Sequence, residues 1–300
     1  MIAKTISMIR WGFLFAWMLK NRGPNSFGIY DVKNSLDLFV NMKKSSYKNL
    51  KAAEVFITKV ERLLRPHISS WPLIRCGPPG DAGYTIARLN SLDYVLSGGA
   101  GKNIDFELEL ARNGSKVFIC DPYVKCLPVT HENIVHYKKK LSSKKSKIFS
   151  LRSWDLIDFY EHIKITREST KLLKLDIEGD EIELLGNKAI SLADYDQIVI
   201  EIHNLFELNS SVSIIKFETL INNLFKDHKC IYLNSNNNGI LLNFGNKFLP
   251  EVVELTLLNN RYFKPDSIQS LDAPKFDNAL NNAKRLPIPN FMALNKFLSG

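Results

Sequence analysis

In the segment Tyr94-Val-Leu-Ser-Gly-Gly-Ala-Gly101, a short apolar run leads directly into a cluster of three glycines. The apolar run predicts a buried strand, and the spacing of Phe106, Leu108 and Leu110 after the glycines predicts a helix. Glycine in such a turn lets the backbone approach a ligand closely, and the start of the helix offers N–H groups without partners. The segment therefore predicts a strand, a turn and a helix that together bind a small molecule.

Further strands and helices alternate along the chain after this segment. Apolar runs predict six more strands, at residues 117–120, 133–137, 172–175, 197–202, 230–233 and 252–258. Helical spacing predicts helices at 47–65 and 212–225 and around Ile182 to Leu185. Such alternation favours a parallel sheet covered on both faces. The expected fold is α/β, a Rossmann-like, doubly wound and mainly parallel seven-stranded sheet with an N-terminal helical extension.

Length and composition indicate one globular domain with additions. The chain has 300 residues, 45% of them hydrophobic and 24% charged, which excludes collagen-like and mostly disordered proteins. The expected boundaries are a helical extension over 1–70, a cofactor-binding domain over 71–262 and a tail over 263–300 that packs on the domain. The four cysteines form no C-x-x-C pair, which argues against a disulfide framework or a zinc site. They indicate a reducing, cytoplasmic location.

The charge balance favours an anionic partner. The chain carries 40 Lys and Arg against 31 Asp and Glu, a formal net charge of +9. Such an excess suits nucleic acid, phospholipid headgroups or an acidic substrate. Residues 138–147 contain six of the lysines, and this basic segment is either a solvated loop or a basic lip over a substrate or a membrane surface.

Residues 1–22 contain an apolar run from Trp11 to Leu19, between Arg10 and Lys20. The run is less than half of the about 20 residues that span a bilayer. No small-residue cleavage site of a signal peptide follows it. These residues predict a short helix that either packs on the domain or makes a peripheral contact with a membrane.

Residues capable of chemistry follow three of the predicted strands. Asp121 follows the second strand, Asp176 and Glu178 follow the fourth, and His203 follows the fifth. In a parallel sheet the ligand lies beyond the carboxyl ends of the strands, so these side chains are expected to converge. Asp121 has the place of a carboxylate that accepts both hydroxyls of an adenosine ribose.

The glycine cluster does not fit a nicotinamide cofactor. Counted from Gly99, the sequence reads Gly-Ala-Gly-Lys-Asn-Ile, so Ile104 stands where the G-x-G-x-x-G fingerprint needs its third glycine. An adenosine cofactor that does not require this fingerprint fits better.

Several segments resemble known cofactor motifs. Val95 to Gly101 and Phe118 to Pro122 resemble the first two motifs of class I S-adenosylmethionine-dependent methyltransferases. The segment Leu173-Lys-Leu-Asp-Ile-Glu-Gly-Asp-Glu181 is similar to the K-x-D-x-E-G-x-E pattern of the FkbM-type family within that class. Arg75 to Tyr84, expected to be a loop, resembles a D-G-G-Y element in which Ala82 replaces one glycine. The resemblance covers roughly residues 70–260.

The resemblance implies that S-adenosylmethionine is the cofactor and that a hydroxyl of a glycan or another small molecule is the acceptor. It implies a set of cofactor-binding residues: Ser97, Gly98, Gly99, Gly101, Asp121, Asp81 and Tyr84. Ser97 departs from the family pattern, in which an acidic residue usually ends the first strand.

Methylation of a hydroxyl calls for a base or a metal ion, because a hydroxyl is a poor nucleophile. His203 is the candidate base, since an unperturbed imidazole titrates at about 6.5. It could also be a structural residue held by a backbone partner. Asp176 and Glu178 are the other candidate catalytic residues and could hold a cation such as Mg²⁺. Glu181 is expected to cap or to pack.

Two other functions stay open at this point. A nucleic-acid methyltransferase would suit the positive charge, but the place of its N/D-P-P-Y/F motif reads Asp176-Ile-Glu-Gly179. A non-catalytic, basic, membrane-peripheral binding module with a vestigial cofactor pocket would suit the departure at Ser97.

Overall fold

The computed structural model describes residues 50–143, 153–163, 165, 168–186, 190–236, 239, 241–244 and 247–264. The expectations for residues 1–22, for the tail beyond residue 264 and for Lys144, Lys145 and Lys147 lie outside these residues. By its contacts the chain divides between Ser45 and Ser46, and every described residue belongs to the second unit.

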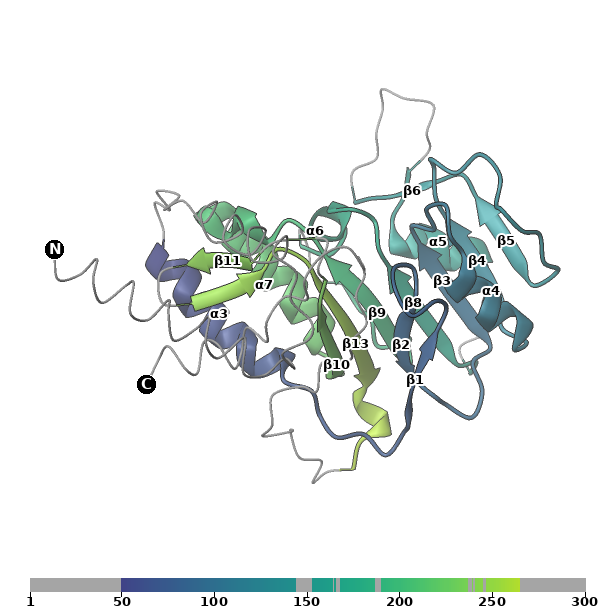
Figure 1. The fold of residues 1–300 in the computed structure, drawn as a ribbon, viewed down its shortest axis with the longest axis horizontal. Coiled ribbons are helices and arrows are strands. Elements are labelled where there is room, and N and C mark those ends of the chain that lie inside the picture. Colours follow the sequence, from purple (N-terminus) through teal and green to yellow (C-terminus); the bar gives the residue numbers. More distant parts are fainter. Residues whose placement is uncertain are drawn as a thin grey trace, which may run out of the picture. The chain divides into compact units, whose positions relative to one another are not determined.

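A seven-stranded sheet forms the centre of this unit (Figure 1). Its order is β10-β13-β9-β8-β3-β4-β5, and β9, β8, β3, β4 and β5 are parallel. Only β13 is antiparallel to both of its neighbours in this sheet. The strands are β3 Tyr94–Gly98, β4 Lys116–Cys120, β5 Ile134–Tyr137, β8 Lys171–Leu175, β9 Gln197–Ile202, β10 His228–Ser235 and β13 Val253–Asn259. The predicted α/β class with a mainly parallel seven-stranded sheet is confirmed.

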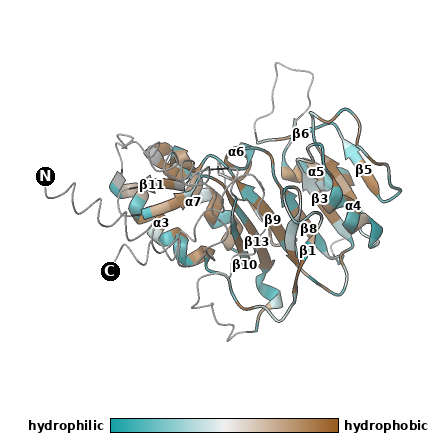
Figure 2. Ribbon diagram, viewed as in Figure 1, coloured by the Kyte–Doolittle hydropathy of each residue, from teal (hydrophilic) through white to brown (hydrophobic). Residues whose placement is uncertain are grey.

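Both faces of the sheet are covered, because every residue of β8, β9 and β13 is buried. The crossover from β3 to β4 runs toward one edge of the sheet, and the crossover from β8 to β9 runs toward the other. Because crossovers between parallel strands are right-handed in nearly all proteins, these two opposite directions lead us to expect α4 Asp105–Arg112 and α6 Asp180–Leu185 on opposite faces. Figure 2 shows hydrophobic residues concentrated on the central strands.

A hairpin lies where the sequence predicted a loop. Strands β1 Leu73–Cys76 and β2 Tyr84–Ala87 pair antiparallel. The amide of Gln197 on β9 fixes the hairpin to the sheet, since its Nε2 donates to the carbonyl of Ala87 (2.9 Å) and its Oε1 accepts from the N–H of Ala87 (2.8 Å). The hairpin and α4 pack in one hydrophobic cluster with β3 and β4. This packing carries Tyr84 toward the carboxyl ends of the strands.

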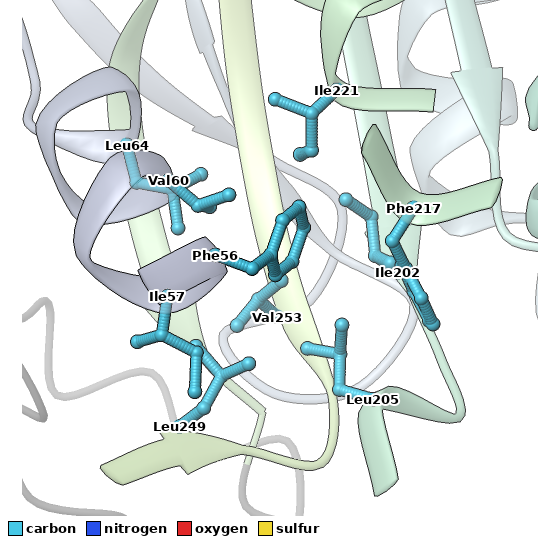
Figure 3. Close-up of a pocket in the computed structure, with 10 residues that line it drawn as sticks. All are labelled: Phe56, Ile57, Val60, Leu64, Ile202, Leu205, Phe217, Ile221, Leu249 and Val253. Carbon is cyan, nitrogen blue, oxygen red and sulfur yellow. The ribbon is translucent and has the colours of Figure 1, made fainter. Parts of the chain in front are cut away.

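The helix α3 Leu50–Leu64 shares a core with the sheet. Phe56 and Val60 of α3 meet Phe217 of α7 Ser211–Phe225 and Val253 of β13 around a small apolar cavity of about 20 Å³ (Figure 3). A cavity without polar groups in its lining offers a water molecule no partners, so it stays dry. Within the described residues, α3 is therefore part of the packed core.

The remaining elements are short. They are β6 Lys140–Leu141 paired with β7 Ser153–Trp154, β11 Leu241–Phe244 paired with β12 Lys247–Pro250, α5 Leu156–Ile163, and two 3₁₀ turns at Leu205–Asn209 and Asn260–Tyr262. In the part of the chain described above, we find no helix with the length and apolar character needed to cross a bilayer. All four cysteines are free, and only Cys126 is exposed.

Candidate functional site

A cavity of about 820 Å³ opens at the carboxyl ends of the parallel strands. Its size lies in the range of sites that bind small molecules. Most of the residues predicted from the sequence line it: Asp81, Tyr84, Gly99, Gly101, Asp121, Asp176, Glu178 and His203. Ser97 and Gly98 belong to β3 and lie behind this lining.

The glycine turn after β3 lies directly against the turn after β8. Gly99 has a φ of +77°, and a Cβ at this position would fall 1.7 Å from the carbonyl oxygen of Asp176. The N–H of Asp176 donates to the carbonyl of Gly98 at 3.0 Å. Only glycine permits this approach, so the contact explains why the first strand runs into a glycine cluster.

Asp121 holds the glycine turn to the turn after β4. Its Oδ2 accepts the N–H groups of Ala100 (3.0 Å) and Gly101 (3.1 Å), and its Oδ1 accepts those of Tyr123 (2.8 Å) and Val124 (3.2 Å). Burial opposes the charge on this carboxylate, but the four donors outweigh burial and lower the pKa of Asp121. Both carboxylate oxygens of Asp121 already accept hydrogen bonds from backbone N–H groups. The predicted contact between Asp121 and a ribose remains a prediction.

Beneath the glycine turn lies a network of buried polar side chains that the sequence analysis did not identify. The hydroxyl of Ser97 donates to Glu107 Oε1 at 2.6 Å, and the ammonium of Lys174 lies 3.6 Å from the same oxygen. Lys174 also donates to the carbonyl of Gly99 and lies 3.8 Å from Asp176 Oδ2. Burial favours the neutral amine, but the charges of Glu107 and Asp176 outweigh it and raise the pKa of Lys174. Lys174 and Glu107 also line the cavity, so a positive charge lies in its wall below the glycine turn.

His203 lies at the centre of a group of carboxylates. Its Nε2 is 3.5 Å from Glu201 Oε2, 3.6 Å from Glu178 Oε2 and 3.9 Å from Asp176 Oδ1. Burial disfavours the imidazolium, but the hydrogen bond to Glu181 and the surrounding negative charges outweigh it and raise the pKa of His203 to about 9. At neutral pH the imidazole is charged in the free protein.

Two buried carboxyl groups beside His203 were missed as functional candidates. Glu181 is fully buried, and its Oε1 lies 3.2 Å from His203 Nδ1. The expected capping role is also present, because Glu181 accepts the N–H groups of Ile177 and Gly179 at the start of α6. Glu201 accepts both of its bonds from the amide of Asn236, and burial raises its pKa well above the usual range, with Asp176 adding to the effect.

Tyr84 links the hairpin to the site. Its hydroxyl donates to Asp176 Oδ2 at 2.6 Å, and its ring packs edge-on against Phe106 with 5.1 Å between the ring centroids. Burial raises the pKa of Tyr84 well above its usual range, and the nearby charge of Asp176 adds to the effect. The hydroxyl of Tyr84 therefore stays protonated, and its hydrogen bond to Oδ2 orients the carboxylate of Asp176. The other oxygen of Asp176, Oδ1, faces His203.

The segment from Glu178 to Gly179 has strained geometry at the rim of the cavity. Both residues have left-handed backbone conformations, with φ of +55° and +101°. A side chain at Gly179 would collide with the amide of Asn204. The side chain of Glu178 is 86% exposed. Left-handed conformation in a residue with a Cβ costs energy and is found most often at functional sites.

Asp176, Glu178 and His203 could together hold a divalent cation. One ligand atom of each lies within 4.8 Å of the others. Glu181 bonds to His203 Nδ1 and Tyr84 bonds to Asp176 Oδ2, so Nε2 and Oδ1 are the atoms left for a cation. The two carboxylates suit a hard cation such as Mg²⁺, for which an imidazole is an uncommon ligand.

The described part of the basic segment reaches the rim of the cavity. Lys140 lines it and forms an ion pair with Asp180 at 2.7 Å. Lys139 lies over the ring of Trp154, 5.5 Å from its centroid. A role of these lysines in attracting an anion remains a prediction.

No protein-family model matches the chain, and no curated protein matches its sequence.

Proposed function

We propose that this protein is an S-adenosylmethionine-dependent O-methyltransferase that acts on a hydroxyl of a glycan or another small molecule. The observation that carries the proposal is the cavity at the strand ends. It combines a glycine turn open to a nucleoside with an imidazole and carboxylates that can face an acceptor hydroxyl.

The strand order supports this class of cofactor. Numbered along the chain, the seven strands of the sheet have the order 3-2-1-4-5-7-6, and the seventh is antiparallel. The first five positions are those of the doubly wound Rossmann-like fold, whose dinucleotide-binding form continues to the sixth strand directly. An antiparallel seventh strand inserted between the fifth and sixth is the arrangement of class I methyltransferases. The K-x-D-x-E-G-x-E segment, which holds Lys174, Asp176, Glu178 and Glu181, supports an FkbM-type member of that class.

The reaction needs an acceptor oxygen in line with the methyl group. Bound S-adenosylmethionine would supply the methyl group and would leave as a neutral thioether that keeps the electron pair of the broken carbon–sulfur bond, so the residues of this chain would have to take up the hydroxyl proton. The hydroxyl proton passes to Nε2 of His203 in its neutral form, whose population rises as the pH approaches the raised pKa of about 9, and the positive charge lost from sulfur reappears on the imidazolium. Alignment of the reacting atoms at about 3 Å supplies much of the rate enhancement.

The carboxylates stabilise the product charge on His203. Glu178, Glu181 and Asp176 surround the imidazole at 3.2–3.9 Å, and these contacts strengthen when the ring becomes cationic. If a divalent cation is held by Asp176, Glu178 and His203, it supplies Lewis-acid stabilisation of the acceptor oxygen.

Substitution of His203 tests this function. In His203→Ala we expect kcat to fall by about 10²–10⁴, because a positioned base contributes that much. We expect the affinity for S-adenosylhomocysteine to change less than about twofold, because the adenosine side of the cavity is built by Gly99 to Gly101 and Asp121. Turnover can be followed with a panel of hydroxylated acceptors, and affinity by calorimetric titration.

His131→Ala is the matched control, because His131 does not line the cavity and should leave both quantities unchanged. Full activity in His203→Ala would contradict the assigned role.

Treatment of the parent protein with a chelator distinguishes catalysis by a bound cation from catalysis by the imidazole alone. Activity abolished by chelator and restored by Mg²⁺ assigns the cation to the site, whereas unchanged activity assigns the step to the imidazole alone.

A further inference from the structure

We infer that Glu181 is a positioning residue that holds the imidazole of His203 with Nε2 toward the acceptor. This inference rests on the proposed function and deepens it. The sequence analysis predicted a capping or packing role for Glu181, and the fold brings its carboxylate 3.2 Å from His203 Nδ1.

Glu181 is rigidly held before it meets the histidine. Its side chain is fully buried on α6, and its Oε1 and Oε2 accept the N–H groups of Ile177 (2.8 Å) and Gly179 (2.9 Å). These two donors belong to the turn that follows β8, the same turn that carries Asp176 and Glu178. The carboxylate therefore ties His203, which follows β9, to the turn after β8.

The contact between Glu181 and Nδ1 sets the tautomer of neutral His203, and therefore which ring nitrogen presents a lone pair to the cavity. A carboxylate accepts hydrogen bonds and cannot donate one, so the neutral ring carries its proton on Nδ1 and leaves Nε2 as the acceptor. When Nε2 takes the hydroxyl proton, the same carboxylate stabilises the imidazolium. A buried carboxylate behind a histidine performs these two tasks in unrelated hydrolases.

A role limited to capping α6 would not need a histidine contact. The N–H groups of Ile177 and Gly179 already use both oxygens of Glu181, and the neighbouring acids of the same helix point elsewhere. Asp180 pairs with Lys140, and Glu183 pairs with Lys216. Among the three acids of α6, Glu181 is the one in contact with His203.

The substitution Glu181→Gln tests the inference, with Glu183→Gln as the matched control on the same helix. The amide keeps the size of the side chain but can donate to Nδ1, which favours the wrong tautomer. We expect kcat to fall by about 10²–10⁴, the contribution of a positioned base, because an amide behind a catalytic histidine favours the wrong tautomer. The KM for S-adenosylmethionine and the affinity for S-adenosylhomocysteine should change less than about twofold. Glu183→Gln should keep the parent kcat.

A second readout does not depend on turnover. In ¹⁵N-detected spectra recorded through a pH titration, the neutral ring of the parent should show the proton on Nδ1, next to Glu181 Oε1, and Glu181→Gln should shift the population toward Nε2. Glu181→Asp restores the charge on a shorter side chain and should recover part of the lost kcat. In the His203→Ala background, Glu181→Gln should cause little further loss, because the two residues act as one unit.

Two results would overturn the inference. One is an unchanged kcat and tautomer in a folded Glu181→Gln protein. The other is a loss of stability in Glu181→Gln and Glu181→Asp alike with the parent tautomer retained, which would make Glu181 purely structural. If the parent protein neither binds S-adenosylhomocysteine nor transfers methyl groups, the proposed function fails, and the tautomer measurement still reports whether Glu181 orients His203.

Discussion

Gly99 is the residue at which the two turns of the site come closest. Gly99→Ala would add a Cβ 1.7 Å from the carbonyl oxygen of Asp176, whereas a Cβ at Gly101 meets nothing within 4 Å. Both glycines have positive φ, so each alanine costs about 1–2 kcal/mol of backbone strain. Gly99→Ala should cost clearly more, because the turn after β8 must also move.

Chemical denaturation of both variants measures this difference. Gly101→Ala serves as the control for backbone strain alone. Equal losses of unfolding free energy in the two variants would show that the turns after β3 and β8 are not in the contact described here.

Part of the site could be predicted from single residues. The carboxyl ends of parallel strands share one edge, so Asp121, Asp176 and His203 could be placed together by their positions after apolar runs. The contacts of Lys174 and Glu181 could not. Lys174 interrupts an otherwise apolar strand, which gave a weak signal of a buried charge, and its partner Glu107 comes from a helix 67 positions earlier in the sequence. Such pairings depend on how α4 and α6 sit on the sheet.

At the scale of elements, α3 provides a test of whether the first described helix belongs to the core. Phe56 is buried beside the small cavity in Figure 3, whereas Val55, one position earlier, is 65% exposed. Phe56→Ala should lower the free energy of unfolding by about 3–5 kcal/mol, because it enlarges an apolar cavity. Val55→Ala should change it by less than about 0.5 kcal/mol.

Urea denaturation at one wavelength is sufficient for this comparison. Similar small effects of Phe56→Ala and Val55→Ala would contradict the packing of α3 on α7 and β13.

The elements differ in how well the sequence predicts them. All seven strands of the central sheet were predicted, because buried strands appear as continuous apolar runs bounded by turns. The hairpin β1–β2 was missed because its strands are four residues long and flank a segment with two prolines and three glycines. Such a segment indicates a loop. The two short strands beside it depend on contacts with Gln197 and with the face of the sheet, which the local sequence does not reveal.

Ala82 lies in that same loop with a φ of +62°, a conformation that favours glycine. This positive φ explains why the D-G-G-Y element has a glycine at the position that Ala82 occupies in this chain.

At the scale of the whole molecule, His228 makes folding stability depend on pH. Its ring is buried, and its Nε2 lies 2.9 Å from the carbonyl of Tyr195. Burial lowers the pKa of His228 to about 4. Between pH 6.5 and 4 the unfolded chain binds a proton at this residue and the folded chain does not, so stability falls as the pH falls through this range. The expected contribution is on the order of 2 kcal/mol.

His228→Gln removes this titration. The difference in unfolding free energy between pH 7 and pH 4.5 should therefore be smaller in the variant than in the parent protein, as measured by urea denaturation at both pH values. An unchanged difference would show that His228 is accessible to protons in the folded state.

The central claim, that the cavity at the strand ends binds S-adenosylmethionine, is tested most directly by calorimetric titration of the full chain with S-adenosylhomocysteine, with NAD as the control ligand. We predict one site with a micromolar Kd, which corresponds to about 8 kcal/mol of binding free energy, and no binding of NAD. Absence of binding to S-adenosylhomocysteine, or binding of NAD with equal affinity, would contradict the account.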